Sequence, residues 1–166
     1  MWEVEQLAGE SQDSTPESVC AYVARAFGVR RTEVALLQTA GSVLRFLHPA
    51  ELKHAGAIPL SSFSIAARTV RTKRADIFNS FSQVRHTTIF EVVKLNESGS
   101  GTEVIQKLMS APVVDQAGEV IGVIQVSRKA HSPAAAGRDF TPEDLQQLKA
   151  AAASVGKLMA SGKMDL

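Results

Sequence analysis

The chain is predicted to fold as an α+β protein, with an antiparallel sheet sandwiched by helices. Two pairs of β-rich apolar runs flank the turn sequences Ala40-Gly41 and Asp115-Gln116-Ala117-Gly118, and each pair is typical of a hairpin. Amphipathic stretches with helix-start signatures precede the first pair and follow the second. Because hairpin strands pair antiparallel and helices need a surface to cover, this order predicts helices on the faces of one sheet.

The first helix is predicted to follow Ser14-Thr15-Pro16-Glu17, a helix-start signature, and to end at Gly28. An apolar stripe with spacings of three and four residues runs along it, at Val19, Cys20, Val23 and Phe27. Strands are then expected over residues 33–39 and 42–47, and a short one over residues 58–60.

The middle of the chain predicts a helix over residues 61–74, with Ile65, Ala66 and Val70 inward and its Arg and Lys side chains outward. A short strand is expected over residues 75–78. Residues 86–94 fit a helix turn or a strand, and residues 96–101 have the composition of a flexible loop.

The last helix is expected to begin at Thr141 as its cap, with Pro142 in the first position. Glu143 and Asp144 place carboxylates in its positive first turn.

Composition narrows the class of protein. With 166 residues the chain suits one domain, expected over residues 14–160 between a flexible leader (1–13) and a flexible tail (161–166). The net charge of +1 gives no reason to expect nucleic acid as a partner, and no apolar run approaches the roughly 20 residues needed to span a membrane. Without a signal peptide and with a single cysteine, a cytoplasmic protein is expected.

Taken in order, these motifs resemble the GAF domain family, a regulatory small-molecule-sensing fold, over about residues 15–159. The residues that carry the resemblance most sharply are Ile58-Pro59-Leu60, Asp115, Gly118, Ile121, Gly122, Val123, Phe140, Thr141, Glu143 and Asp144. The resemblance implies a GAF-like sheet between helices and a regulatory role.

Two ligand-binding branches of the family have signatures that this chain lacks. Bilin-binding members carry Asp-Ile-Pro, whereas here Asp76-Ile77 is followed by Phe78. Cyclic-nucleotide members carry an acidic pair where this chain has Lys94-Leu95. Tight binding of cyclic nucleotides is therefore not expected.

No catalytic or metal site is expected, and no cofactor. GAF-type methionine sulfoxide reductases depend on several cysteines, and this chain has only Cys20, which is better explained as a small buried side chain than as a redox sensor. The four histidines lack the short spacings of a metal site; they are His48, His54, His86 and His131.

A small-molecule site is expected on one face of the sheet, below residues 78–94. Aromatic rings would cradle a flat ligand, and the serines that open the middle helix, with the arginines along it, would favour an anionic group. A core packed by the same rings is the alternative. The expected ligand-binding residues are Phe46, Ser62, Phe63, Phe78, Asn79, Ser80, Phe81, His86, Phe90 and Met109.

A homodimer is expected through the first and last helices, because apolar side chains three and four residues apart are typical of a seam between two helices. One helix packing on its own sheet is the alternative. The expected interface residues are Val19, Val23, Phe27, Leu145, Leu148, Val155 and Met159.

These observations together predict a non-enzymatic regulatory sensor in signal transduction or transcription control. A small ligand would bind and the terminal helices would carry the signal. A dimerisation module whose pocket is filled by its own phenylalanines is the alternative.

Overall fold

The computed structural model describes residues 14–81, 103–164 and 166. Within them, a six-stranded antiparallel sheet with the order β3-β2-β1-β6-β5-β4 forms the middle layer. The strands are β1 (Val34–Ala40), β2 (Val43–His48), β3 (Ala57–Pro59), β4 (Asp76–Phe78), β5 (Val104–Val114) and β6 (Val120–Ala130).

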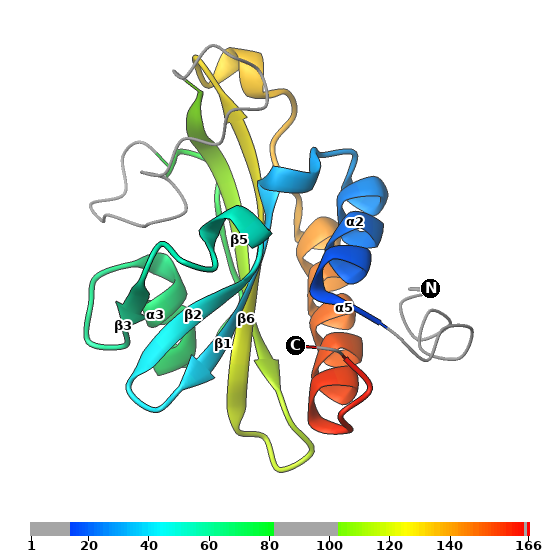
Figure 1. The fold of residues 1–166 in the computed structure, drawn as a ribbon. Helices are drawn as coiled ribbons and strands as arrows, with labels where there is room; N and C mark the ends of the chain where they lie inside the picture. The colour runs from blue at the N-terminus through cyan, green and yellow to red at the C-terminus, as the bar shows by residue number, and fades with distance from the viewer. Residues whose placement is uncertain (1–13, 82–102, 165) are drawn as a thin grey trace.

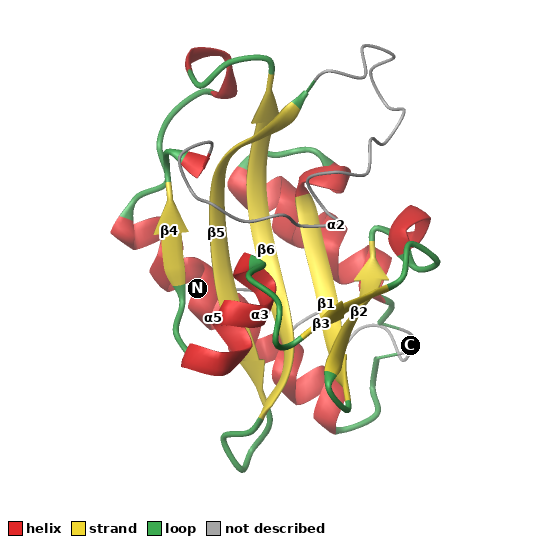
Figure 2. Ribbon diagram, turned by 90° about the vertical axis from the view of Figure 1, so that its left-hand side faces the viewer, coloured by secondary structure: helices red, strands yellow, loops and turns green. Residues whose placement is uncertain are grey.

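Helices cover both faces of this sheet. Helices α2 (Pro16–Phe27) and α5 (Pro142–Ala160) lie on one face and α3 (Ile65–Thr72) on the other (Figure 1). Single turns of 3₁₀ helix occur at Arg31–Glu33, Ala50–Leu52 and Ala134–Ala136. Figure 2 shows the short strands β3 and β4 at opposite edges of the sheet. The predicted α+β sandwich is confirmed.

Both long helices begin where their caps predict. The Oγ1 of Thr15 accepts the N–H of Ser18 at 3.1 Å, and the N–H of Thr15 donates to the Ser18 hydroxyl at 3.0 Å. Thr141 and Asp144 form the same reciprocal pair at the start of α5, at 2.8 and 3.1 Å. Each pair satisfies two backbone N–H groups that a helix end would otherwise leave unpaired.

Helix α3 is shorter than predicted, since it begins at Ile65 and not at residue 61. The Oγ of Ser64 accepts the N–H of Ala67 at 3.1 Å and so caps the helix. The earlier serines belong to the loop, because a capping side chain favours extended backbone at its own position. As expected, Ile65 and Ala66 are buried, whereas Val70 is only half-buried.

The hairpin between β5 and β6 is held by Asp115. Its backbone N–H donates to the carbonyl of Glu119 at 2.9 Å, and its Oδ1 accepts the N–H groups of Ala117 and Glu119 at 2.9 and 3.0 Å. Gly118 takes a φ of +81°, which a glycine adopts without strain. The predicted Asp-to-Gly turn is confirmed.

Two apolar clusters lie on opposite faces of the sheet, and neighbouring residues of a strand contribute to different clusters. On β1, Leu36 packs beneath α2 and α5, whereas Leu37 packs towards α3. On β6, Ile124 and Val123 divide in the same way. The central strands are therefore buried on both sides, as their nearly continuous apolar runs require.

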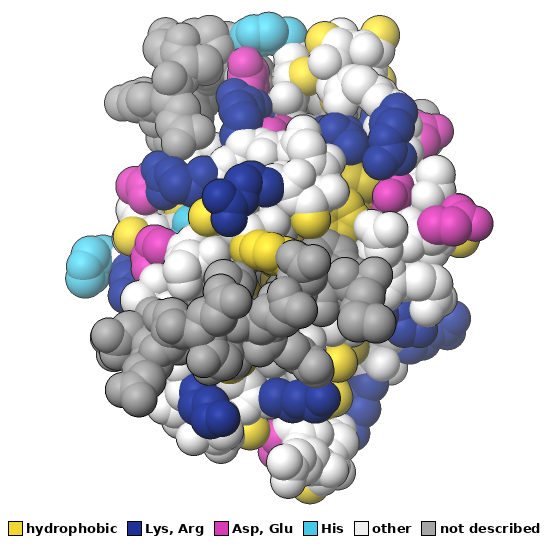
Figure 3. All heavy atoms as spheres, turned by 90° about the vertical axis from the view of Figure 1, so that its right-hand side faces the viewer, with side chains coloured by type: hydrophobic (Ala, Val, Ile, Leu, Met, Phe, Trp, Pro, Cys, Tyr) yellow, Lys and Arg dark blue, Asp and Glu magenta, His cyan; other side chains and the backbone are white. Residues whose placement is uncertain are grey.

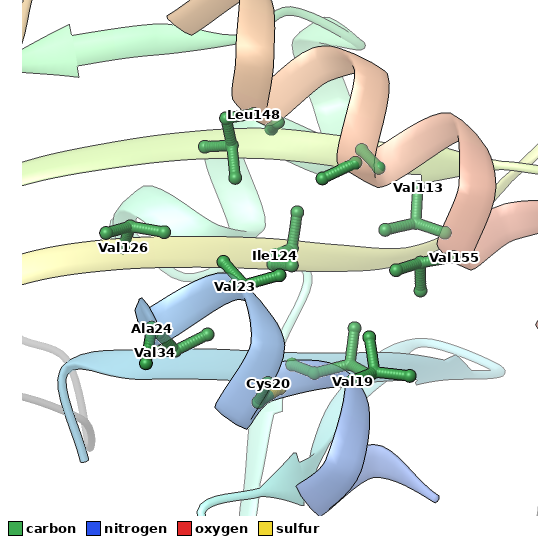
Figure 4. Close-up of a cluster of buried hydrophobic side chains, with 14 of the residues drawn as sticks. Val19, Cys20, Val23, Ala24, Val34, Val113, Ile124, Val126, Leu148 and Val155 are labelled. Carbon is green, nitrogen blue, oxygen red and sulfur yellow. The ribbon is translucent and has the colours of Figure 1, made fainter. Parts of the chain in front are cut away.

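The predicted dimer seam is wrong, because its side chains face the chain's own sheet. Figure 3 views the molecule from the α2/α5 side, and around the grey atoms many side chains are charged or polar. Figure 4 shows Val19, Val23, Leu148 and Val155 in the cluster between the helices and the sheet. A stripe with spacings of three and four identifies an apolar face but not what covers it. Val19, Val23, Leu148 and Val155 are 0% exposed, Phe27 is 4% exposed, and Leu145 and Met159 pack partly buried against the same cluster.

The packed part of the chain extends beyond the expected boundary at residue 160. Met164 is buried in the α2/α5 cluster, and its backbone forms a parallel bridge with Ser14. The predicted leader, residues 1–13, lies outside the described residues. No helix in the described part of the chain has both the length and the apolar character to cross a membrane.

Two glycines let the backbone come close at points where a side chain would collide. A Cβ at Gly122 on β6 would lie 2.5 Å from the carbonyl oxygen of Leu37, and one at Gly156 on α5 would lie 2.2 Å from that of Val114. The first contact sets the spacing between β6 and β1, and the second seats α5 directly on the end of β5. A glycine inside a strand is typical of such a point of close approach.

Gly122→Ala is expected to lower the free energy of unfolding by about 1–3 kcal/mol, because the new methyl group collides with backbone that cannot rotate away. Urea unfolding measures it. Thr39→Ala, a half-buried position near the end of β1, is the control and should change stability by less than about 0.5 kcal/mol. Equal effects of the two substitutions would contradict the role given to Gly122.

His48 is a buried histidine at the end of β2. It is 0% exposed, its Nε2 lies 3.0 Å from the carbonyl oxygen of Arg31, and its Nδ1 has no hydrogen-bond partner among the described residues. Burial lowers the pKa of the imidazole below its usual 6.5, and the positive charge of Arg31 lowers it further. The hydrogen bond to the Arg31 carbonyl and the negative charges of Glu17 and Glu51 oppose this shift without cancelling it. The folded chain therefore holds His48 neutral.

Stability is expected to fall as the pH drops below about 6.5, because the unfolded chain then binds a proton that folded His48 resists. Above that pH the histidine is neutral in both states and contributes nothing. Urea unfolding at about pH 8 and pH 5.5 tests this, since pH 5.5 leaves the carboxylates largely ionised. His48→Gln should lose less stability between the two pH values than the unmodified chain, and an equal loss in both would refute the explanation.

Candidate functional site

Three of the predicted ligand-binding phenylalanines lie on the α3 face of the sheet. Phe46 on β2 and Phe81 after β4 are 3% and 1% exposed and belong to the cluster under α3. Phe78 on β4 is half-buried and packs against the same cluster. Because β1, β6 and β5 lie between β2 and β4, the three rings are spread along this face; they are called here the aromatic group because they share one apolar cluster.

Two of the predicted residues lie elsewhere. Met109 is 0% exposed, but its side chain belongs to the α2/α5 cluster on the opposite face of the sheet. Phe63 lies in the loop before α3 with 83% of its surface exposed. The prediction for Met109 is wrong, because the preceding residue on β5, Leu108, faces α3 instead. Phe63 lies outside the core, because α3 starts late.

Asn79 has a structural role. Its Nδ2 donates to the carbonyl oxygen of Phe140, and its Oδ1 accepts the N–H of Phe140, both at 2.9 Å. The side-chain amide thus ties the end of β4 to the start of α5, and both ends of the amide are occupied. Ser80 is exposed beside it, and Ser62 is hydrogen-bonded to the hydroxyl of Ser64 at 3.0 Å.

The remaining two predicted ligand-binding residues, His86 and Phe90, lie outside the described residues, as does the whole ambiguous segment 86–94.

A buried polar group under α3 was missed by the sequence analysis. The hydroxyls of Thr69 and Ser110 are 2.7 Å apart, and Nε2 of Gln125 donates to the Ser110 hydroxyl at 3.1 Å. All three side chains are at most 4% exposed. The signal was available, because Ser110 and Gln125 each interrupt an apolar run within their strand, and a buried polar side chain has to find a hydrogen-bond partner.

Positive charge near the α3 face is largely committed to protein contacts. The Arg71 guanidinium donates to the carbonyl oxygens of Leu60 and Ser62 and so fixes the loop before α3. Arg68 lies over the ring of Phe78, 5.7 Å from its centroid. The N–H of Ala67 at the start of α3 is already satisfied by Ser64. The expected anion site at the serines therefore has little free donor capacity.

The described residues offer little support for a catalytic nucleophile or a metal site. Cys20 is 0% exposed, and burial raises the pKa of its thiol, so the thiol stays protonated. Among these residues no group of three His, Cys, Asp or Glu side chains is placed to hold a metal ion. What the α3 face offers is an apolar bed with aromatic rings and a few buried hydrogen-bonding groups, the composition of a small-molecule site.

Asn79→Ala is expected to lower the free energy of unfolding by about 1–3 kcal/mol, because it leaves the backbone N–H and C=O of Phe140 without partners. The neighbouring exposed Ser80→Ala is the matched control and should stay within about 0.5 kcal/mol of the unmodified chain. Chemical denaturation of both variants measures the difference. If Asn79→Ala behaves like the control, the amide does not anchor β4 to α5.

Comparison with known folds places this architecture among sensory and regulatory proteins, and among some enzymes. The GAF domain of an Acinetobacter phosphoenolpyruvate-protein phosphotransferase superposes with a TM-score of 0.70 at 14% identity, covering 96% of this chain and 90% of that one. A segment of a methyl-accepting chemotaxis protein gives 0.66 at 14% identity, covering 95% of each chain. Free methionine-R-sulfoxide reductase from Neisseria meningitidis gives 0.65 at 12% identity, covering 93% and 82%.

A comparison with curated protein sequences gives no significant match. The family model of the GAF domain, however, matches residues 17–159, from the start of α2 to the end of α5. The sheet order and the helices on both its faces agree with that match. The chain belongs to the GAF domain family.

Proposed function

We propose that this chain is a regulatory sensor domain that binds a small ligand on the α3 face of its sheet and transmits the event through α2 and α5. The observation that carries the proposal is that Phe46, Phe78 and Phe81 all belong to the apolar cluster on that face. Phe78 is only half-buried, so one edge of the aromatic group is accessible to a ligand. Stacking and apolar contact with the ring would supply most of the affinity.

Polar groups near the rings would give the site selectivity. Ser110 and Gln125 lie on the α3 face of β5 and β6 and are joined to Thr69 of α3 by hydrogen bonds. A ligand that shifted α3 would have to rearrange this buried network, which costs free energy unless new hydrogen bonds replace the old ones. The network therefore resists a displacement of α3, and a ligand that shifted the helix would have to offset this cost.

The sheet offers a direct route from the ligand face to the terminal helices. Leu108 faces α3 while its neighbour Met109 faces α2 and α5, and Val123 and Ile124 on β6 divide in the same way. Because close-packed interiors transmit small displacements, a shift of β5 or β6 under the ligand would be felt at α5. Helix α5 is seated on β5 through Gly156, where the backbones are in close contact.

A role without catalysis is part of the proposal. The fold is shared with free methionine-R-sulfoxide reductases, so the fold alone does not decide between sensing and catalysis. The buried, protonated thiol of Cys20 favours sensing, because a thiol must be accessible and ionised to act as a nucleophile.

Homodimerisation remains a second part of the proposal, although the predicted seam cannot carry it. A partner would have to contact the outer surfaces of α2 and α5, where Arg25, Gln146 and Ala150 are exposed. Light scattering at high micromolar concentration tests this, and a monomer there would remove dimerisation from the mechanism.

One specific observation favours the alternative of a dimerisation module without a ligand. Phe46 and Phe81 are buried by the chain's own side chains, which is what a self-filled pocket would look like. The two functions differ in the role of Phe78, because in a sensor the accessible part of its ring would contact the ligand, whereas in a dimerisation module it would have no ligand to contact.

A thermal-shift screen with cyclic nucleotides, aromatic acids and 2-oxo acids should yield a compound that raises the melting temperature. Calorimetry with that compound should show Phe78→Ala weakening binding about fivefold or more, which corresponds to a loss of about 1 kcal/mol. The removed ring forms part of the proposed binding surface, so its loss should reduce contact area directly.

Phe63→Ala is the matched control, because it removes the same side chain from an exposed loop and should leave the affinity unchanged. Equal loss in both variants, or no stabiliser across the screen, would favour the self-filled module.

A further inference from the structure

A second hollow lies on the α5 side of the sheet, away from the aromatic group. It is a groove of about 500 Å³, called here the basic groove. One wall is the turn from α3 into β4, the other is α5, and the floor is the end of β5. The groove opens where β4 stops, because β4 covers β5 only from Leu108 to Ser110.

Three cationic side chains from three parts of the chain rim the basic groove. Lys73 ends α3, Arg74 follows it, and Lys149 lies on α5. All three are exposed, and in the described part of the chain none of them forms an ion pair. On the α2/α5 side of the molecule, Lys and Arg side chains gather at the lower right of Figure 3.

The nearest acidic residues in sequence do not line the basic groove. Asp76 begins β4, one position beyond Ala75, the last lining residue of that wall. The Oδ1 of Asp115 is engaged with two N–H groups of the hairpin turn. Like charges held around one hollow repel each other and raise its positive potential, so an anion placed among them would be favoured.

The floor between the cations is apolar. Ala75, Pro112, Val114 and Ala153 supply it. A volume of this size lies within the range of small-molecule sites, and a mixed lining of apolar floor and cationic rim suits a ligand with both characters. We propose that the basic groove is a second binding site of this chain, for a small organic anion with a phosphate or carboxylate group and an apolar body.

Lys73, at the rim of the basic groove, has a backbone conformation that residues other than glycine disfavour. It ends α3 with a φ of +56°, the only described non-glycine residue with positive φ. Glycine is favoured at this position of a helix end, because a Cβ there crowds the backbone. The local fold would thus be better served by glycine, and what the lysine adds is a cation at the rim of the groove.

The walls of the groove are fixed before any ligand arrives. Gly156 brings α5 against the Val114 carbonyl, so the helix cannot move closer to β5. A smaller hollow shares Val114 and Ala153 with the basic groove and is also lined by Asp115, Gln116, Gly156 and Lys157. A site with preset walls loses less entropy on binding than one that must be ordered by its ligand.

The test is an NMR titration of the ¹⁵N-labelled full chain at about 50 mM salt, where exposed charges are weakly screened. Phenyl phosphate and inorganic phosphate are the probes, at about pH 8, where both are mainly dianions and only the first has an apolar body. Saturable amide shifts confined to residues 73–75, 113–114 and 149–157 are expected. Phenyl phosphate should bind at least about threefold more tightly than inorganic phosphate, because its ring covers the apolar floor.

The double variant Arg74→Gln/Lys149→Gln should weaken phenyl phosphate at least about fivefold. Arg45→Gln/Lys53→Gln is the control with the same change of net charge, at exposed positions outside the groove, and should bind as the unmodified chain does. Equal weakening by both variants, scattered shifts, no shift at all, or equal affinity for the two probes would each overturn the proposal.

Lys73→Gly separates binding from folding. It should raise the melting temperature by about 2–4 °C, because it relieves the left-handed backbone, and at the same time weaken phenyl phosphate. If Lys73 had only a structural role, the substitution would change the melting temperature alone. A variant that is stabilised but binds the probe with unchanged affinity would remove Lys73 from the site.

Discussion

The fold depends on burying both faces of three central strands, β1, β6 and β5. Neighbouring residues on these strands contribute to opposite clusters, so a register slip of one residue would exchange the side chains of the two faces. The register is held by local features, among them the Asp115 turn between β5 and β6 and the close contact of Gly122 with Leu37 of β1. The helices can then pack on a surface whose shape is already determined, and α5 does so through Gly156.

Features fixed by a few neighbouring residues could be predicted from the sequence. Thr15 and Thr141 cap their helices through partners three residues away, and the Asp115 turn closes within five residues, so short stretches of sequence contain the whole interaction. The same locality explains why the sheet, its hairpins and the family could be predicted. The length of α3 could not, because both a helix that starts at residue 61 and a serine cap at Ser64 satisfy the same pattern.

Which face of the sheet a side chain lies on depends on residues far away in sequence, and predictions of this kind were correct for some residues and wrong for others. Phe46, Phe78 and Phe81 do lie on one face, but Met109 lies on the other, and a shift in pairing near Ile105 breaks the alternation along β5. The seam on α2 and α5 was predicted as apolar, which is correct, and as intersubunit, which is not. Periodicity indicates that a stripe is buried, but only the folded structure shows that the chain's own sheet covers it.

Strand β5 connects the two proposed sites. Phe78 pairs with Leu108 on this strand, and Pro112, four residues further on, forms part of the floor of the basic groove. Helix α5 is both a wall of that groove and the proposed output of the aromatic site. A ligand in either site would therefore act on the same strand and helix, and linkage requires any effect of one ligand on the affinity of the other to be equal in both directions. With α5 in backbone contact with Val114, an anion in the basic groove would stabilise the seated position of the helix, so it would oppose a ligand that displaces α5 and favour one that retains it.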